Sequence, residues 1–322
     1  MTDKRIAPHL GTLALHAGQE PDVDYLLHAP LLELVAHADK IRRESKGCEF
    51  ELCNIVNAKS GLCGEDCKFC AQSARHSCNV PTYPLKRGNE IHKAAEDAWE
   101  MGADHFGIVT SGNRLGKEEL DSLAEAISNI RSKVKIRICA SLGALRASEL
   151  SALKDAGLSR YQHNIETSRR YYPRIVSTHE FDQRLATIQA AKNVGLEVCS
   201  GGIIGIGETW QDRIDMARLL KNLDVDSVPV NLLVPIEGTA MGSLEPMSCV
   251  DAVRTICIFR IILPKATIKV AAGRETVLKD FQSLAFMAGA NGMLIGGYLT
   301  VGGRSPAEDH RLVAQVQEAW AQ

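Results

Sequence analysis

The segment ELCNIVNAKSGLCGEDCKFC, residues 51–70, decides how the rest of the chain is interpreted. It ends in three cysteines, Cys63, Cys67 and Cys70, spaced C-x3-C-x2-C in a loop that carries Gly, Asp and Lys. Three thiolates on one short loop can bind three irons of a [4Fe–4S] cluster and leave the fourth iron open to another ligand. Zinc loops more often combine two C-x2-C units or add a pair of histidines, and no such partner follows. Structural zinc, or three unrelated thiols, is the alternative interpretation.

Length and composition limit the class of protein. The 322 residues suit a single α/β barrel, and 45% hydrophobic with only 5% aromatic residues predicts a mostly aliphatic core. A net charge of −2 argues against nucleic-acid or acidic-membrane partners. The N-terminal residues lack the apolar core of a signal peptide, and no apolar run reaches the roughly 18 residues of a membrane span. The ten cysteines are therefore expected to be reduced and metal-binding in a cytoplasmic protein.

Strand-like and helix-like segments alternate along most of the chain, which predicts a parallel sheet. Strands are expected at 51–56, 104–110, 135–140, 160–166, 196–200, 227–233, 267–271 and 292–296. Helices are expected at 90–101, 117–132, 147–156, 181–194, 210–222, 249–262 and 276–288, after a first helix over 31–43. Eight strands in this pattern predict a (βα)8 TIM-type barrel over residues 47–322, with an N-terminal helical extension over residues 1–46.

The alternation of side chains along each strand predicts which residues point into the barrel. If the aliphatic residues face the helices, an unusual polar and thiol-bearing set faces the lumen: Glu51, Cys53, His105, Gly107, Arg137, Cys139, Glu197, Cys199, Asn231 and Lys269. A packed barrel instead fills its interior with branched aliphatic residues. Buried cysteine is common as a small hydrophobe, but three inward thiols on three strands favour a second iron–sulfur site at Cys53, Cys139 and Cys199.

Polar residues at the ends of three strands are candidates for ligand binding. Asn164 and Glu166, in HNIETS, lie on one strand face and suit the hydroxyls of a ribose; a polar strand end is the alternative. Asn231 can both donate to and accept from a urea or an amide. Thr110, in VTSG, ends the second strand at the expected mouth of the barrel.

A glycine-rich turn also points to a ligand. The segment CSGGIIGIGET, 199–209, leads from a strand through Gly205 into a helix, so its backbone could approach an anionic group closely. Alone this signal is moderate, because such turns often contain glycine.

Taken together, these motifs resemble the biotin synthase family of the radical S-adenosylmethionine (SAM) superfamily. The resemblance runs from about Cys53 to past Asp309, and its motifs are CGEDCKFCAQSA (63–74), YQHNIETS (161–168), CSGGIIGIGET (199–209), VPVNLLVPIEGT (228–239), AGRE (272–275) and FMAGAN (286–291). The family implies a SAM-dependent (βα)8 barrel, usually a homodimer, that inserts sulfur from an auxiliary cluster into dethiobiotin. It also implies a low-potential electron donor of the flavodoxin or ferredoxin type and a supply from the iron–sulfur assembly machinery.

The resemblance assigns roles to individual residues. Cys63, Cys67 and Cys70 would hold the [4Fe–4S] cluster that binds SAM. The residues implied to contact SAM are Phe69, Thr110, Asn164, Glu166 and Gly205. Asn164 would also contact dethiobiotin, and Asn231 would hold its ureido ring. Glu166 stands where the family commonly has aspartate.

The chain departs from the well-known family pattern at the auxiliary cluster. That pattern has a [2Fe–2S] cluster on three cysteines and an arginine, and two of the cysteines correspond to Cys139 and Cys199. The third position is Gly107, and the arginine position is Lys269. Cys53, where the pattern has serine, is expected to supply the missing thiol to a differently ligated, larger sulfur-rich cluster like that attributed to the oxygen-avoiding branch of the family.

Two other functions stay open at this point. Another radical SAM barrel, of the hydrogenase-maturation or methylornithine-synthase type, would share the triplet and the fold, although the segments at 199–202 and 228–233 favour the first reading. A non-catalytic iron–sulfur carrier would not need Asn164, Glu166 or the glycine turn, and it would not bind SAM.

Overall fold

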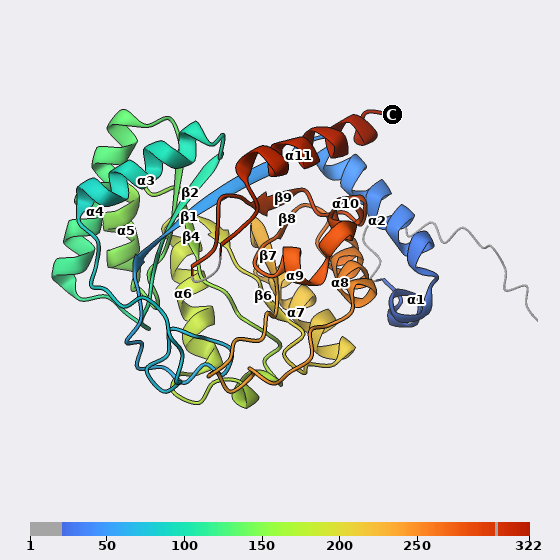
Figure 1. The fold of residues 1–322 in the computed structure, drawn as a ribbon, viewed down its shortest axis with the longest axis horizontal. Coiled ribbons are helices and arrows are strands. Elements are labelled where there is room, and N and C mark those ends of the chain that lie inside the picture. The colour runs from blue at the N-terminus through green and yellow to red at the C-terminus, as the bar shows by residue number, and fades with distance from the viewer. Residues whose placement is uncertain (1–20, 300–301) are drawn as a thin grey trace, which may run out of the picture.

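Nine parallel strands form a sheet that closes on itself, in a computed structural model that describes residues 21–299 and 302–322. The sheet order is β5-β4-β3-β2-β1-β9-β8-β7-β6, and a further pairing of β5 with β7 closes the ring (Figure 1). The strands are β1 Glu51–Lys59, β2 His105–Thr110, β3 Arg137–Ser141, β4 Arg160–Gln162, β5 Glu197–Cys199, β6 Gly202–Ile204, β7 Ser227–Leu232, β8 Thr267–Val270 and β9 Gly292–Leu294. Since β5 and β6 are consecutive parts of one side of the barrel, the predicted eight-stranded barrel is confirmed. The part of the predicted N-terminal extension before residue 21 lies outside the described residues.

Helices follow the strands and cover the outside of the barrel (Figure 1). Their bounds are α3 Gly88–Glu100, α4 Lys117–Lys133, α5 Ala147–Ala156, α6 Phe181–Asn193, α7 Trp210–Asn222 and α8 Cys249–Ile262. The helix predicted over 276–288 is wrong as a single element. The chain forms α9 Arg274–Val277, a 3-10 turn and α10 Gln282–Met287 instead, because Lys279 takes a positive φ of 48° that a continuous helix does not allow.

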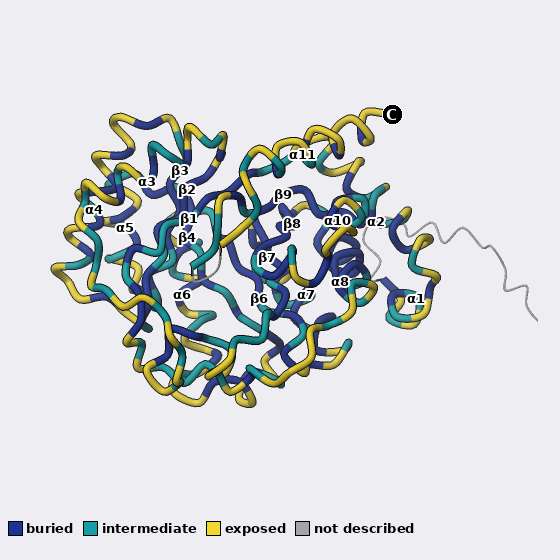
Figure 2. The backbone as a smooth tube through the Cα atoms, in the orientation of Figure 1, coloured by how far each residue is buried: buried dark blue, intermediate teal, exposed yellow. Residues whose placement is uncertain are grey.

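The outward sides of the strands form the core between barrel and helices. Phe106, Ile108, Val228, Ile268 and Val270 are at most 1% exposed. Figure 2 shows this as buried strands inside a partly exposed outer layer. The predicted aliphatic outward side of these strands is therefore confirmed. In the described residues, no helix is both long and apolar enough to cross a membrane.

Segments from both ends of the chain pack side by side. Two N-terminal helices, α1 Val23–His28 and α2 Leu31–Lys46, precede the barrel. The guanidinium of Arg42 stacks 3.8 Å from the ring centroid of Trp320, which lies in the last helix, α11 Pro306–Trp320. Arg254 of α8 donates to the carbonyls of Leu26 at 3.2 Å and Ala29 at 2.9 Å. These contacts hold the N-terminal helices against the barrel.

A buried ion pair attaches α11 to the end of the barrel. Arg274, 1% exposed, donates to Asp309, which is fully buried, at 2.7 Å. Arg274 also donates to the side-chain oxygens of Gln282 and Tyr298. The pair therefore links α9, α10 and α11.

Replacing Asp309 by asparagine is expected to lower the free energy of unfolding by about 3 kcal/mol, because it leaves the Arg274 charge buried with less compensation. Denaturant unfolding of the two proteins measures this difference. Asp280→Asn, at an exposed site, is the matched control and should change stability by less than about 0.5 kcal/mol. Equal stability of Asp309→Asn and Asp280→Asn would contradict the anchoring role.

Candidate functional site

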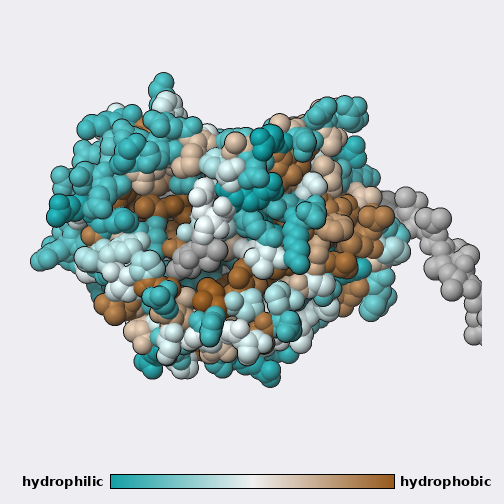
Figure 3. All heavy atoms as spheres, in the orientation of Figure 1, coloured by the Kyte–Doolittle hydropathy of each residue, from teal (hydrophilic) through white to brown (hydrophobic). Residues whose placement is uncertain are grey.

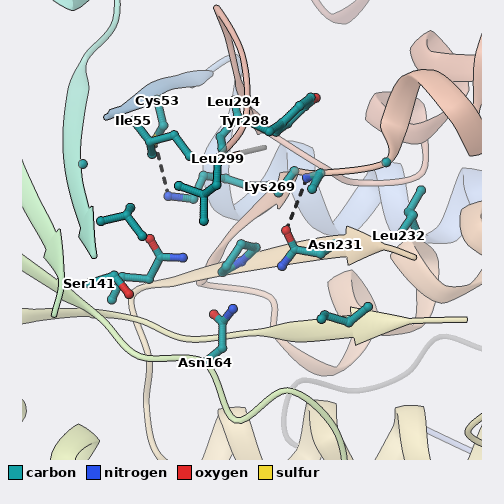
Figure 4. A pocket seen from close by; sticks show the side chains of 18 of the residues that line it. Cys53, Ile55, Ser141, Asn164, Asn231, Leu232, Lys269, Leu294, Tyr298 and Leu299 are labelled. Carbon is teal, nitrogen blue, oxygen red and sulfur yellow. Dashed lines mark hydrogen bonds between the residues drawn. The ribbon is translucent and has the colours of Figure 1, made fainter. Parts of the chain in front are cut away.

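A cavity of about 400 Å³ occupies the barrel lumen and opens at the carboxyl ends of the strands, where TIM barrels carry their active sites. On the face seen in Figure 3, hydrophobic atoms gather in the hollows near the centre, and Figure 4 shows side chains pointing into the cavity. The predicted site residues that line it are Cys53, Phe69, Cys70, Cys139, Asn164, Glu166, Cys199 and Asn231. Most of the candidate site is thus brought to one space.

The cysteine loop is held by its own backbone at the rim of this cavity. The N–H of Cys63 donates to the carbonyl of Gln72 at 3.1 Å, and Ala74 returns a bond to Cys63 at 2.8 Å. The N–H of Cys70 donates to Cys67 at 2.9 Å. All three thiols are free and half-buried, and burial raises the pKa of Cys70 to about 11. Three free thiols gathered on one loop suit iron–sulfur ligation.

The segment that follows β4 anchors this loop. Asp66 accepts from the backbone N–H groups of Ser177 at 2.9 Å and Thr178 at 3.2 Å. The N–H of Lys68 donates to the carbonyl of Ile175 at 3.0 Å. The hydrogen bonds to Asp66 outweigh its desolvation by burial and lower the pKa of its carboxyl. The loop is therefore preorganised without help from a ligand.

A second connection was not foreseen from the sequence. Glu65 lies 2.6 Å from Nδ1 of His179, whose Nε2 lies 2.9 Å from Arg184. Arg184 then donates to the carbonyl of Asn164 at 2.9 Å and lies 3.7 Å from the carboxylate of Glu166. The relay joins the cysteine loop to HNIETS, and no spacing rule would reveal it because Glu65 and His179 are 114 positions apart.

The surroundings of Glu166 are the clearest indication that the cavity binds a ligand. Its backbone is left-handed, with φ 67°, and its carbonyl accepts from Ile203 at 2.8 Å. A Cβ on Gly202 would lie 2.2 Å from that carbonyl, so only glycine allows this approach. The Oε2 atom of Glu166 is buried with no hydrogen-bond partner in the protein. A strained backbone that aims an unpartnered carboxylate into a cavity fits a ligand hydroxyl.

The amide side chains of Asn164 and Asn231 are held in place by hydrogen bonds near Glu166. Asn164 accepts from the N–H of Gly201 at 3.2 Å. Asn231 donates to the carbonyl of Gly202 at 3.1 Å and accepts from Ala272 at 3.3 Å (Figure 4). An amide has two N–H donors and a carbonyl with two lone pairs, so each side chain keeps capacity to bind a ligand in a fixed orientation.

Two predicted cofactor contacts do not lie at the cavity. Thr110 is an odd number of residues from His105 and Gly107 on β2, and its buried Oγ1 has no hydrogen-bond partner in the described part of the protein. The N–H of Gly205 donates to Glu208 at 3.0 Å, so this carboxylate occupies the place where an anionic ligand was expected. Neither residue is among the described residues that line the cavity, and their contact with SAM stays a prediction.

The floor of the lumen carries a polar cluster beneath the three thiols. Glu51 accepts from Arg160 at 2.6 Å and 3.1 Å and from Lys269 at 3.1 Å. Lys269 also donates to the sulfur of Cys53 at 3.4 Å (Figure 4). Burial alone would raise the pKa of Glu51, but Lys269 and the hydrogen bonds from His105 and Arg160 lower it. The carboxylate is therefore charged and compensated.

The three lumen thiols themselves are almost completely buried. Cys53 is 6%, Cys139 8% and Cys199 3% exposed, and all three line the cavity as predicted. Burial raises the pKa of Cys53, although the Lys269 charge opposes it, and raises the pKa of Cys139 to about 12. Arg137, predicted to face the same space, lies half-exposed below it and pairs with Glu197. In the described part of the chain, no three Cys, His, Asp or Glu side chains converge on one metal ion. Thiols that lie apart suit a cluster, in which different irons take different thiolates.

At Gly107, a side chain would make a tight contact with its neighbour on β1. A Cβ at this position would lie 3.0 Å from Cγ2 of Ile55. We expect Gly107→Cys to lower the free energy of unfolding by about 1–3 kcal/mol through overpacking. Adding Ile55→Ala should remove most of that penalty, so a double-mutant cycle on the metal-free protein should give a favourable coupling of about 1 kcal/mol or more. Strict additivity would show that Ile55 is not the obstacle.

Comparisons with known proteins agree with this architecture. The Radical SAM superfamily profile matches residues 59–220, and the Biotin and Thiamin Synthesis associated domain matches residues 229–317. A biotin synthase of Thermotoga neapolitana is 52% identical over 85% of this chain and 98% of its own length. One from Clostridium perfringens is 45% identical over 90% of this chain and 91% of its own.

Solved structures share the fold at lower identity. Methylornithine synthase superimposes with a TM-score of 0.77 at 20% identity, covering 90% of this chain and 88% of that one. The [FeFe]-hydrogenase maturase from Carboxydothermus hydrogenoformans gives 0.75 at 20% identity, covering 90% of this chain and 72% of that one. The barrel, the cysteine loop and the matched profile define a radical SAM enzyme. Within that superfamily, the chain belongs to the biotin synthase family.

Proposed function

We propose that this enzyme converts dethiobiotin to biotin, with SAM as the radical source and an auxiliary iron–sulfur cluster in the lumen as the sulfur donor. The observation that carries the proposal is that Phe69 and Cys70 of the cysteine loop, the unpartnered Glu166 carboxylate and three buried thiols line one cavity. A cavity of this kind suits a small organic substrate held between two metal centres.

The site residues have separate proposed roles in binding the cluster, SAM and the substrate. Cys63, Cys67 and Cys70 hold the [4Fe–4S] cluster, which when bound supplies the electron for reductive cleavage of SAM. The proposed SAM contacts at the cavity are Phe69, Asn164 and Glu166. Asn231, fixed by Gly202 and Ala272, orients the ureido ring of the substrate. Water is kept from the radical because the reacting groups lie inside the barrel.

Sulfur is proposed to come from a cluster bound by Cys53, Cys139 and Cys199. The positions filled by Gly107 and Lys269 exclude the usual [2Fe–2S] ligand set, and Cys53 supplies a thiol from the neighbouring strand. The cationic neighbours Lys269 and Arg160 suit the negative charge of such a cluster, which supports the assignment.

Replacing Glu166 by alanine is expected to weaken SAM binding by about 10- to 100-fold, because hydrogen bonds to a charged group contribute about 1.5–3 kcal/mol. Glu166→Asp, the residue common in the family, should retain most of the affinity. A SAM titration of the anaerobically reconstituted proteins measures both. Unchanged affinity in Glu166→Ala would remove Glu166 from the SAM site, and an absence of SAM binding by the unmodified enzyme would favour the iron–sulfur carrier.

The function is tested by anaerobic incubation with SAM, a reductant and dethiobiotin. We expect biotin and 5′-deoxyadenosine together. Deoxyadenosine with no biotin would indicate that the enzyme has another radical SAM activity, of the methylornithine-synthase or hydrogenase-maturation type.

The cellular setting is proposed from the same family relation. We infer a cytoplasmic homodimer that receives electrons from a flavodoxin- or ferredoxin-type donor and clusters from the iron–sulfur assembly machinery. We also propose that residues 47–322 are the catalytic unit and residues 1–46 an extension of it. Sedimentation of the reconstituted enzyme tests the dimer.

A further inference from the structure

We propose that His105 is the fourth protein ligand of the auxiliary cluster, beside Cys53, Cys139 and Cys199. This inference rests on the proposed function, because it presumes a cluster in the lumen. It adds a metal-binding role for a residue that the usual cysteine and arginine pattern does not include.

The position of His105 places it among the thiols. The residue lies on β2, directly in register with Cys53 on β1, and its side chain is 2% exposed. Its Nδ1 atom lies 3.4 Å from the sulfur of Cys139 on β3. Among the described residues that line the cavity, it is the one histidine. The four donors then come from four strands around one space: β1, β2, β3 and β5.

The other ring nitrogen determines which tautomer is present. Nε2 of His105 lies 3.2 Å from Oε2 of Glu51. Glu51 already accepts from Arg160 and Lys269, so it is an ionised carboxylate that can only accept. Nε2 therefore carries the proton. In a neutral imidazole this leaves a lone pair on Nδ1, beside Cys139, and metal-binding histidines commonly donate their second N–H to a carboxylate in this way.

The alternative donors in the lumen are less suitable. Lys269 is an ammonium group that pairs with Glu51 and donates to Cys53, so it offers charge and hydrogen bonds, not a lone pair. Gly107, next on the same side of β2, has no side chain. Cys53 and His105 are paired across β1 and β2, and the next pair on the same side is Ile55 and Gly107. His105 can therefore supply, from the preceding pair, the ligand that Gly107 lacks.

A histidine ligand can be identified by the magnetic coupling of its nitrogen to the cluster. The full-length chain with Cys63, Cys67 and Cys70 all changed to alanine should hold only the auxiliary cluster. It is prepared with natural-abundance or ¹⁵N-labelled histidine, reconstituted without oxygen and reduced with dithionite. Pulsed EPR of the reduced cluster is expected to show a strongly coupled nitrogen that changes from ¹⁴N to ¹⁵N with the label. A hydrogen bond alone would give only weak coupling.

Two variants complete the test. His105→Asn should lose the strong coupling, while His92→Gln, on the outer helix α3, should keep it. Circular dichroism of His105→Asn reports whether the barrel is still folded. If it is not, the ¹⁵N-histidine label in the protein that retains His105 decides whether a histidine binds the cluster. A lumen cluster with no strong histidine coupling would overturn the ligand and leave the proposed function standing. Failure of the unaltered chain to bind any iron beyond the first cluster would overturn both.

Discussion

Replacing Cys67 by alanine removes the SAM-binding [4Fe–4S] cluster and reduces 5′-deoxyadenosine formation to background. Two thiolates on the loop leave one iron of the cluster without its protein ligand. Iron analysis and deoxyadenosine quantification after anaerobic reconstitution measure the loss. The effect on activity is expected to be complete, since the electron for SAM cleavage has no other source in the mechanism.

Cys48→Ala is the matched control for this change. Cys48 is an exposed free thiol outside the loop and outside the cavity lining. It should retain both the iron and the deoxyadenosine of the unmodified enzyme. A Cys67→Ala protein that still cleaves SAM would show that the triplet is not the site of the radical chemistry.

Replacing Cys53 by serine is expected to affect the auxiliary cluster and not the SAM-binding cluster. The substitution keeps the size of the side chain but removes a lumen thiol, so auxiliary iron and sulfide should fall while the cluster on Cys63, Cys67 and Cys70 remains. Deoxyadenosine should still form, whereas biotin formation should fall to background because its sulfur donor is missing. Iron, sulfide and both products are measured on the same reconstituted sample.

The control for Cys53→Ser is Cys257→Ser. Cys257 is also fully buried, but it lies in α8 outside the lumen. Lower iron in both variants would point to a general loss of folding. Unchanged iron and sulfide in Cys53→Ser would remove this residue from the auxiliary site.

Local patterns predicted most of the lumen, with Arg137 as an exception. The alternation of aliphatic and polar residues along each strand is a property of a few consecutive residues, so it placed Cys53, Cys139, Cys199 and Lys269 inside the barrel. The break between β5 and β6, at Ser200 and Gly201, was not predicted because the sequence there shows only a glycine-rich turn.

Polar contacts between residues far apart in the chain could not be predicted from the sequence. Glu65 and His179, which begin the relay to Arg184, are 114 positions apart, and nothing local pairs them. Glu208, which satisfies the glycine turn at Gly205, is closer in sequence, but whether such a turn binds a ligand or a side chain depends on three-dimensional packing. In contrast, α11 could have been predicted, since Ser305 and Glu308 form a capping box around its start.

The central claim is that sulfur in the product comes from a cluster held in the lumen. The most direct measurement reconstitutes the enzyme with ³⁴S-sulfide, removes free sulfide and allows one turnover with SAM and dethiobiotin. The account predicts that the biotin formed carries ³⁴S and that Cys53→Ser forms deoxyadenosine without biotin. Biotin that carries only unlabelled sulfur, or equal biotin formation by Cys53→Ser, would contradict it.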